Sequence, residues 1–337
     1  WHMYGEDSET ISRWKEKIAS LHQKDPEVIV EACIFETAWT TINDIPVPAR
    51  AFEAFGLPVQ SRNFRYGDML YPNGRYINHW GEGGSVPDIT RTETQLWFYS
   101  RAVELIDAGF EGLHFGQVLL MGENDRAGGY PSWKKVFDKV RAYAKTRARR
   151  HMVLINAHTA GMKDASGKLF YDFVCYPLRL KPVSGSVSHE PSADNPQKTD
   201  IQAGYMDSIY LKTLGGVTPS GYAVERLPFF VELDNYGPPP AENLNKVGIA
   251  MWPWGYDEIS WFVNQPAAYR AQWLRETYAL VQSVDPQGFL EMPGSRPAFF
   301  YDKLSPDKGS TAWYYANKTY YFKDEETIRQ IFIADNQ

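Results

Sequence analysis

The feature that most constrains the fold is a repeated alternation of helical patterns with short apolar runs. Each run ends in polar or aromatic side chains, and the next helical pattern follows after a loop. Such alternation is typical of a parallel sheet whose strands are joined by covering helices. The sequence therefore predicts an α/β protein.

Eight of these runs are suitable for strands. They comprise residues 28–36, 63–66, 112–117, 152–156, 170–176, 228–233, 248–252 and 288–292. Helices are predicted between them, as in residues 90–109, where Thr90 and Glu93 form a capping box and Gly109 ends the pattern. Eight strands within 337 residues predict a (β/α)8 TIM barrel with long strand-to-helix loops. We expect a single domain over residues 1–337, with the barrel core at about 25–295 and a C-terminal extension at 296–337.

Composition excludes several classes of protein. The net charge is −6, and Lys and Arg gather only in the short cluster Arg147, Arg149 and Arg150, so we expect no nucleic-acid partner. No apolar stretch reaches the ~18 residues that a membrane span needs. Cys33 and Cys175 lie in predicted buried strands, which favours inert core thiols over a disulfide framework.

Polar and aromatic side chains mark the carboxyl ends of the predicted strands, where the active site of a TIM barrel lies. The candidates are Glu36, Trp39, Trp80, His114, Gln117, Asn156, His158, Glu232, Asp234, Trp252, Trp254 and Glu291. Cleavage of a glycosidic bond needs one carboxylic acid to protonate the leaving oxygen and a second carboxylate as nucleophile or base. Aromatic rings supply surfaces on which sugar rings stack.

Four segments resemble the (β/α)8-barrel glycoside hydrolases in general style. They are residues 112–117 (GLHFGQ), 229–235 (FFVELDN), 251–254 (MWPW) and 289–292 (FLEM). Large groups of these enzymes place an Asn-Glu pair at the end of strand four, whereas this chain has Asn156, Ala157 and His158. The acid must therefore come from elsewhere, or hydrolysis is absent.

The carboxylates receive separate predicted roles. Glu291, in an apolar setting, is the expected general acid, and Glu232 the nucleophile or base. Asp234 would orient Glu232 or hold a sugar hydroxyl. Glu36 and then Glu123 are the next candidates, whereas Glu31 is expected to be a buried structural acid paired to Arg or Lys.

The remaining candidates are expected to bind substrate. Trp252 and Trp254 would form a stacking platform with help from Trp39 and Trp80. Polar contacts to sugar hydroxyls are expected from His114, Gln117, Asn156 and His158. The seven histidines form no His-x-His or His-Glu-x-x-His motif, so we predict no metal, and no nucleotide-binding loop points to a cofactor.

Two alternatives to a glycoside hydrolase remain. The first is a protein that captures glycans on a barrel scaffold without cleaving them, and the second is a barrel lyase, isomerase or metal-dependent hydrolase. A polysaccharide substrate favours a location outside the cytoplasm, either secreted or periplasmic. The sugar, the linkage, the stereochemical outcome and the oligomeric state stay open.

Overall fold

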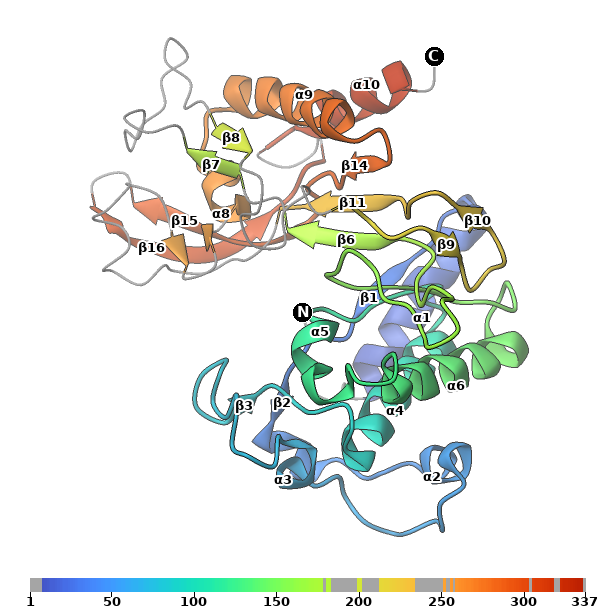
Figure 1. Ribbon diagram of the computed structural model, residues 1–337. Coiled ribbons are helices and arrows are strands. Elements are labelled where there is room, and N and C mark those ends of the chain that lie inside the picture. The colour runs from blue at the N-terminus through green and yellow to red at the C-terminus, as the bar shows by residue number, and fades with distance from the viewer. Residues whose placement is uncertain are drawn as a thin grey trace. The chain divides into compact units, whose positions relative to one another are not determined.

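The computed structural model describes residues 8–177, 180–182, 199–201, 212–233, 251–252, 255–256, 258–302, 305–317 and 322–335. The chain divides into two compact units (Figure 1). Unit 1 comprises Trp1–Val174 and Leu214–Leu227, and unit 2 comprises Cys175–Thr213 and Pro228–Gln337.

Unit 1 contains a parallel sheet of three strands, in the order β1 (Glu31–Cys33), β4 (Gly112–His114) and β5 (Leu154–Asn156). Leu113 and Ile155 are fully buried on one face of this sheet. Since side chains alternate between the faces of a strand, His114 and Asn156 occupy the other face, and they are in register with each other.

Three long helices pack in unit 1. They are α1 (Ser8–Lys24), α4 (Thr92–Ala108) and α6 (Pro131–Arg147), with α4 in contact with both of the others. The predicted helix end at Gly109 is confirmed, because Gly109 caps α4 in the left-handed conformation (φ 104°). The predicted capping box is wrong: Thr90 bonds to Asp88, and Glu93 instead accepts hydrogen bonds from Arg62 and Arg65.

The core of unit 1 is rich in aromatic rings. Trp133 and Phe137 of α6 stack with their centroids 5.0 Å apart, and Phe115, just after β4, meets the edge of both rings. All three side chains are fully buried. Much of the aromatic excess in the sequence therefore serves packing.

Short elements complete unit 1. They are β2 (Ala38–Trp39), η1 (Thr40–Asp44), α2 (Ala49–Phe55), α3 (Tyr66–Met69), β3 (Gly84–Ser85), α5 (Val118–Met121), η2 (Glu123–Asp125), β9 (Gly216–Val217) and β10 (Ala223–Val224). β2 pairs antiparallel with β3, and β9 with β10.

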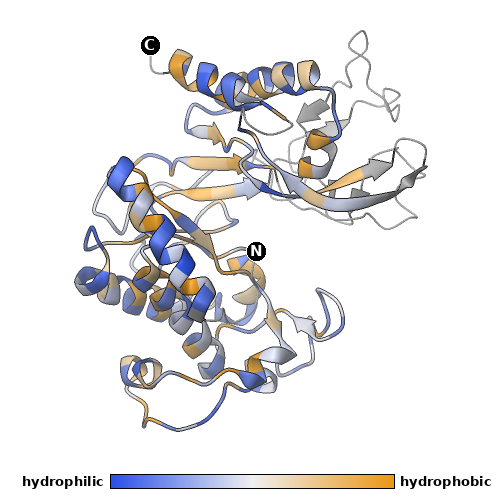
Figure 2. Ribbon diagram, turned by 180° about the vertical axis from the view of Figure 1, so that it is seen from behind, coloured by the Kyte–Doolittle hydropathy of each residue, from blue (hydrophilic) through white to orange (hydrophobic). Residues whose placement is uncertain are grey.

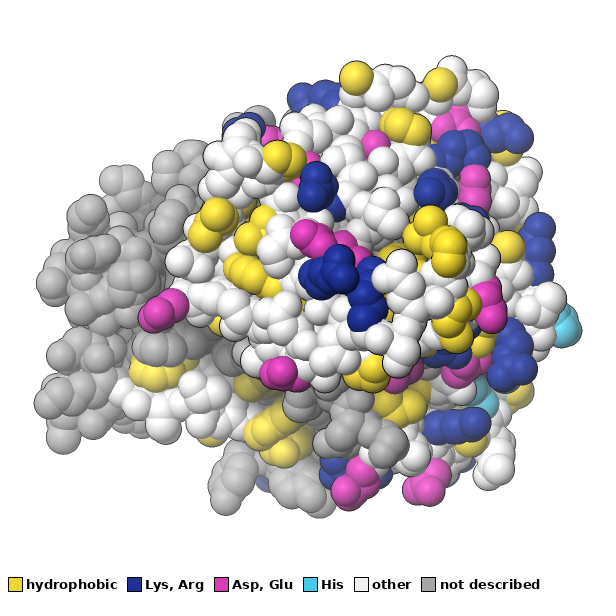
Figure 3. All heavy atoms as spheres, turned by 90° about the horizontal axis from the view of Figure 1, so that it is seen from below, with side chains coloured by type: hydrophobic (Ala, Val, Ile, Leu, Met, Phe, Trp, Pro, Cys, Tyr) yellow, Lys and Arg dark blue, Asp and Glu magenta, His cyan; other side chains and the backbone are white. Residues whose placement is uncertain are grey.

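Several of the described charged side chains form ion pairs. On the face shown in Figure 3, Lys and Arg side chains are interspersed with Asp and Glu. The basic cluster after α6 is one example, because Arg149 and Arg150 form ion pairs with Glu111 at 2.9 and 3.2 Å.

Unit 2 contains a second sheet of three strands, in the order β14 (Gly288–Leu290), β11 (Phe229–Glu232) and β6 (Val174–Pro177). β11 pairs parallel with β14, and β6 runs in the same direction as β11 (Figure 1). Helix α9 (Ala267–Val284) packs against β14. Gly288 leaves room for both neighbours of β14, because a Cβ there would lie 2.6 Å from the Phe229 ring of β11 and 3.1 Å from Val281 of α9.

The C-terminal part of unit 2 is a long antiparallel hairpin, β15 (Arg296–Asp302) and β16 (Ser305–Tyr314), followed by α10 (Glu325–Asp335). The sequence predicts a helix at about 325–334, and α10 confirms it. A buried ion pair between Arg270 and Asp324, 2.9 Å apart, ties the start of α10 to α9. The hydroxyl of Tyr314 also donates to Asp324 (2.7 Å).

The other elements of unit 2 are short. They are β7 (Leu180–Pro182), β8 (Thr199–Ile201), β12 (Met251–Trp252), β13 (Gly255–Tyr256) and α8 (Glu258–Val263). β7 pairs antiparallel with β8, and β12 with β13. Figure 2 shows hydrophobic residues concentrated on the sheet strands, whereas the helices carry both hydrophobic and hydrophilic residues.

The prediction of an eight-stranded (β/α)8 TIM barrel is wrong. The sheets formed by the described residues contain two or three strands, and several pair antiparallel. Residues 63–66, expected to be a strand, contribute one isolated bridge between Pro46 and Asn63 and the first turn of α3. Residues 251–252 pair with 255–256 in a local hairpin. An apolar run shows that a segment is buried but does not determine its pairing partner.

A search of the described helices for membrane spans finds none with the length and apolar character that crossing a bilayer requires. The absence of a membrane span was expected from the sequence.

Candidate functional site

A polar cluster lies at the carboxyl ends of the strands of unit 1. At its centre is Asn156, whose side-chain Nδ2 donates to a carboxylate oxygen of Glu31. The Oδ1 atom of Asn156 lies 2.6 Å from Nδ1 of His114. Gly112 of β4, the strand between β1 and β5, lies opposite Glu31, and a Cβ there would be 3.1 Å from Glu31 Oε2. The missing side chain lets Glu31 reach across β4 to β5.

The hydrogen bonds of this cluster determine the tautomer of His114. An ionised Glu31 only accepts, so the nitrogen of the Asn156 amide faces it and the oxygen faces His114. Because that oxygen also only accepts, Nδ1 of His114 carries a proton. A neutral His114 therefore has its lone pair on Nε2.

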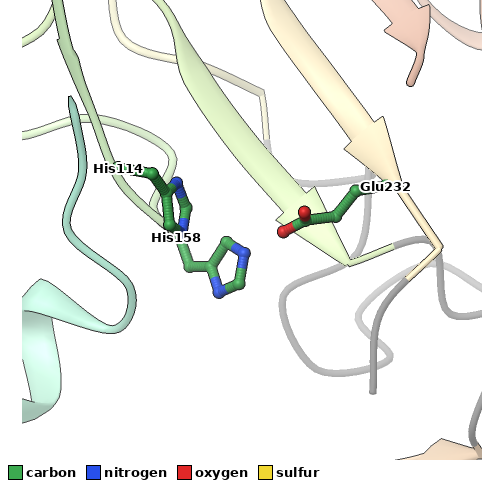
Figure 4. A group of neighbouring side chains, drawn as sticks. All are labelled: His114, His158 and Glu232. Carbon is green, nitrogen blue, oxygen red and sulfur yellow. The ribbon is translucent and has the colours of Figure 1, made fainter. Parts of the chain in front are cut away.

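His158 lies beside His114. The two ring centroids are 4.5 Å apart, and the ring planes form an angle of 64° (Figure 4). The backbone of His158 is held by a hydrogen bond from its N–H to the carbonyl of Gly116 (2.9 Å). The structure thus brings together three residues predicted for substrate binding, namely His114, Asn156 and His158.

Glu36 and Gln117 also lie together, but as an anchor between two loops. One carboxylate oxygen of Glu36 accepts from the backbone N–H of Gln117 (3.1 Å), and the other accepts from Gln117 Nε2 (3.0 Å). Glu36 is 8% exposed. Gly116 has a positive φ of 56°, and a Cβ on it would lie 2.0 Å from Glu36 Oε2. The carboxylate therefore joins the loop after β4 to the segment after β1.

Trp39 and Trp80 lie close to this anchor. The indole N–H of Trp80 donates to the Glu36 carbonyl (3.2 Å), and the Trp39 ring packs on Gly84, where a Cβ would be 2.8 Å from it. Both indoles are partly buried. Trp80 also meets the edge of the His79 ring at a centroid distance of 4.6 Å. These contacts give both tryptophans a role in holding the loop of residues 80–84 against the segment of residues 36–39.

Glu123 and Asp125 have structural roles as well. Glu123 accepts a hydrogen bond from the Tyr76 hydroxyl (2.7 Å) and forms an ion pair with Arg75 (2.5 Å). Burial of the Tyr76 phenol, followed by its bond to Glu123, raises the pKa of Tyr76. Asp125 is buried and accepts from the backbone N–H groups of Ser132 and Trp133, each at 3.0 Å, at the start of α6.

In unit 2, Glu232 and Glu291 lie side by side. β11 and β14 pair with Val231 opposite Leu290, and the Glu291 N–H donates to the Val231 carbonyl (2.8 Å). The two acids are thus the next residues on neighbouring parallel strands. A carboxylate oxygen of each lies within 4.8 Å of the other and of Cys175 Sγ. Figure 4 shows the carboxylate of Glu232 projecting from the end of β11.

The face of the sheet that carries these acids also carries exposed aromatic rings. Phe230 and Phe289 are 39% and 37% exposed, and their centroids lie 6.2 Å apart. Val231, on the opposite face, is fully buried. Since residues two apart share a face of a strand, Phe230 and Glu232 project from the same side.

The burial of the two acids differs from the prediction. Glu291 is exposed and Glu232 is partly buried, so the predicted apolar enclosure of Glu291 is wrong. Glu291 follows the last residue of β14, whereas Glu232 is the last residue of β11.

The remaining predictions concern residues outside the described part of the chain and the two cysteines. Asp234 and Trp254 lie outside the described residues, as does the side chain of Trp252. Cys33 is exposed, so its predicted burial is wrong, whereas Cys175 is buried as expected.

Two residues were missed as parts of these clusters. Glu31 is exposed and bonds to Asn156, where the sequence suggested a buried acid paired to Arg or Lys. Cys175 lies beside the acid pair, and its apolar strand gave no sign of this position.

A comparison with known proteins found no matching protein family, curated sequence or solved structure.

Proposed function

We propose that the protein is a glycoside hydrolase that cleaves an oligo- or polysaccharide with Glu232 and Glu291 as its two carboxylates. The observation that carries the proposal is that oxygens of the two groups lie within 4.8 Å of each other at the ends of adjacent parallel strands. Retaining glycosidases hold their carboxyl groups ~5–5.5 Å apart, and inverting ones ~6.5–9.5 Å apart. The spacing supports a retaining mechanism.

The difference in burial supports a division of roles. Two ionised carboxylates at this separation repel each other, so protonation of one of them is favoured. Burial disfavours the charged form, and Glu232 is the more buried of the two. We assign Glu232 as the general acid and Glu291 as the nucleophile, which reverses the roles expected from the sequence.

The proposed reaction has two steps. Glu232 gives its proton to the glycosidic oxygen while a Glu291 oxygen attacks the anomeric carbon, which breaks the glycosidic bond and forms a glycosyl ester. Glu232, now ionised, takes a proton from water as that water attacks the anomeric carbon and releases Glu291. The exposed rings of Phe230 and Phe289 supply an apolar surface for the C–H faces of a sugar.

The test measures the release of reducing sugar from a panel of plant, algal and host glycans. Glu232→Gln and Glu291→Gln keep the side-chain shape and remove the titrating group, so each is expected to lower turnover by about 100-fold or more. Glu276→Gln is a matched control, because Glu276 is an exposed acid on α9 whose carboxylate bonds to Gln272. It is expected to leave turnover unchanged.

A second readout separates the two roles. An aryl glycoside with a good leaving group needs no protonation, so it is expected to restore bond cleavage in Glu232→Gln but not in Glu291→Gln. Near-native turnover of both variants on a confirmed substrate would refute the acid assignment. Glycan binding without any release would instead favour the glycan-capture function.

A further inference from the structure

His114 and His158 are placed so that one ion could contact both rings. Their nearest ring nitrogens lie within 4.8 Å of each other. Zinc binds imidazole nitrogens at ~2.0–2.1 Å, so two nitrogens on one ion are separated by about 4.2 Å at most. A small rotation of either side chain covers the remaining difference.

The backbone holds the two histidines in these positions. His114 is the last residue of β4, paired in register with Asn156 of β5. The segments after these strands are joined by hydrogen bonds from Phe115 N to the Asn156 carbonyl and from His158 N to the Gly116 carbonyl, both at 2.9 Å. The site thus rests on the sheet of unit 1.

The hydrogen bonds around His114 are a second, independent observation. A histidine that binds a metal through one ring nitrogen almost always donates its other N–H to a carbonyl or carboxylate, which fixes the tautomer. His114 donates through Nδ1 to the Asn156 amide oxygen, and Glu31 holds that amide from its other end. This arrangement places the lone pair on Nε2, as binding of a metal requires.

We propose that His114 and His158 bind a divalent transition-metal ion, with Zn²⁺ as the best match for two imidazole ligands. Asn156 positions the His114 ring, and Glu31 positions Asn156. Zinc prefers four tetrahedral ligands, so two protein nitrogens leave the other positions to water or to a substrate atom. His114 ends β4 and His158 lies two residues beyond β5, so the ligands are far apart in the chain, which explains why the sequence contains no histidine motif with metal-binding spacing.

This inference does not rest on the proposed glycosidase activity. If the chain hydrolyses no glycan, it is still expected to bind the ion. If hydrolysis continues in the presence of a chelator, the proposed metal site is not contradicted.

The test titrates the whole chain with Zn²⁺ alone by calorimetry and with Co²⁺ alone by visible absorption. We expect one ion per chain, with X-ray absorption showing imidazole nitrogen in the coordination shell. His114→Ala and His158→Ala should each abolish this binding, and Asn156→Ala should weaken it by about 10- to 100-fold. Because protons compete with the metal for the imidazole nitrogens, affinity should fall as the pH is lowered.

A control variant and a measurement of folding distinguish loss of the metal site from loss of structure. His151 is exposed in unit 1, and its ring nitrogen lies 3.1 Å from the Lys145 carbonyl, so His151→Ala should bind the ion like the parent chain. Circular dichroism verifies that each variant is folded. The absence of stoichiometric binding of either metal would overturn the proposal, as would affinity unchanged in both His114→Ala and His158→Ala.

Discussion

Replacing Glu36 tests whether this predicted catalytic acid is a structural anchor. Glu36→Ala removes two hydrogen bonds from Gln117, one from its backbone and one from its side chain. Hydrogen bonds to a charged group contribute about 1.5–3 kcal/mol each. Because Gln117 is only partly buried, water replaces some of this interaction, and the lower end of the range applies. We expect a loss of about 3 kcal/mol for Glu36→Ala and about half of that for Glu36→Gln, which keeps one acceptor oxygen.

Hydrogen exchange at the Gln117 amide measures this loss where it occurs. A tenfold change corresponds to 1.4 kcal/mol, so the protection of this amide should fall by about 100-fold in Glu36→Ala if it exchanges through opening of the anchored loop. Glu53→Ala, which removes an exposed acid on α2, should leave the protection unchanged. Turnover per folded molecule should be retained in both variants. Unchanged protection together with a large loss of turnover would show that Glu36 is catalytic and that the anchor argument is wrong.

Two further predictions concern the stability of unit 2. Asp324→Asn leaves the buried guanidinium of Arg270 without its anion, so it should destabilise the protein by about 3–5 kcal/mol in calorimetry, whereas Glu326→Gln in an exposed pair should have little effect. Burial raises the pKa of Tyr269 to about 12, so the folded state keeps a proton that the unfolded chain releases near pH 10. The stabilising contribution is complete below pH 10 and is lost as the pH rises towards 12. Tyr269→Phe should therefore reduce the fall of the denaturation midpoint over that range, and an identical fall in both proteins would contradict the assignment.

The helices were easier to predict from the sequence than the sheets. The apolar pattern of residues 267–284 predicts a helix, and α9 is present with those bounds. A 3.6-residue period is a local property of the sequence, so it can be found without knowing the fold. The runs 228–233 and 288–292 also contain strands, β11 and β14. Their pairing depends on residues far apart in the chain, and no local pattern encodes it. The barrel prediction failed at this step.

The candidate acids show the same limit. The sequence placed Glu232 and Glu291 near each other, although with an intervening strand, whereas the structure puts them on directly paired strands. It could not show which donors surround a carboxylate. The Gly-rich stretch around Asp125 favours a solvated or turn-forming residue, yet Asp125 accepts hydrogen bonds from the N–H groups of Ser132 and Trp133 at the start of α6. The N–H groups that it binds become neighbours only after the chain folds.

The close approach of Glu31 to Gly112 predicts how substitutions at position 112 behave in mutational scans and with second-site changes at position 31. Its backbone does not require a glycine, because its φ lies outside the left-handed region, and the three atoms nearest to an added Cβ all belong to Glu31, namely its Cβ, Oε2 and Cγ. A methyl group at this position would push the Glu31 carboxylate away from Asn156 without blocking the strand. Position 112 would thus score as intolerant in a scan for metal binding while tolerating alanine in a scan for folding. Alanine at 31 would remove two of these three contacts, those with Cγ and Oε2, but would not restore the contact with Asn156, so the two phenotypes would separate genetically.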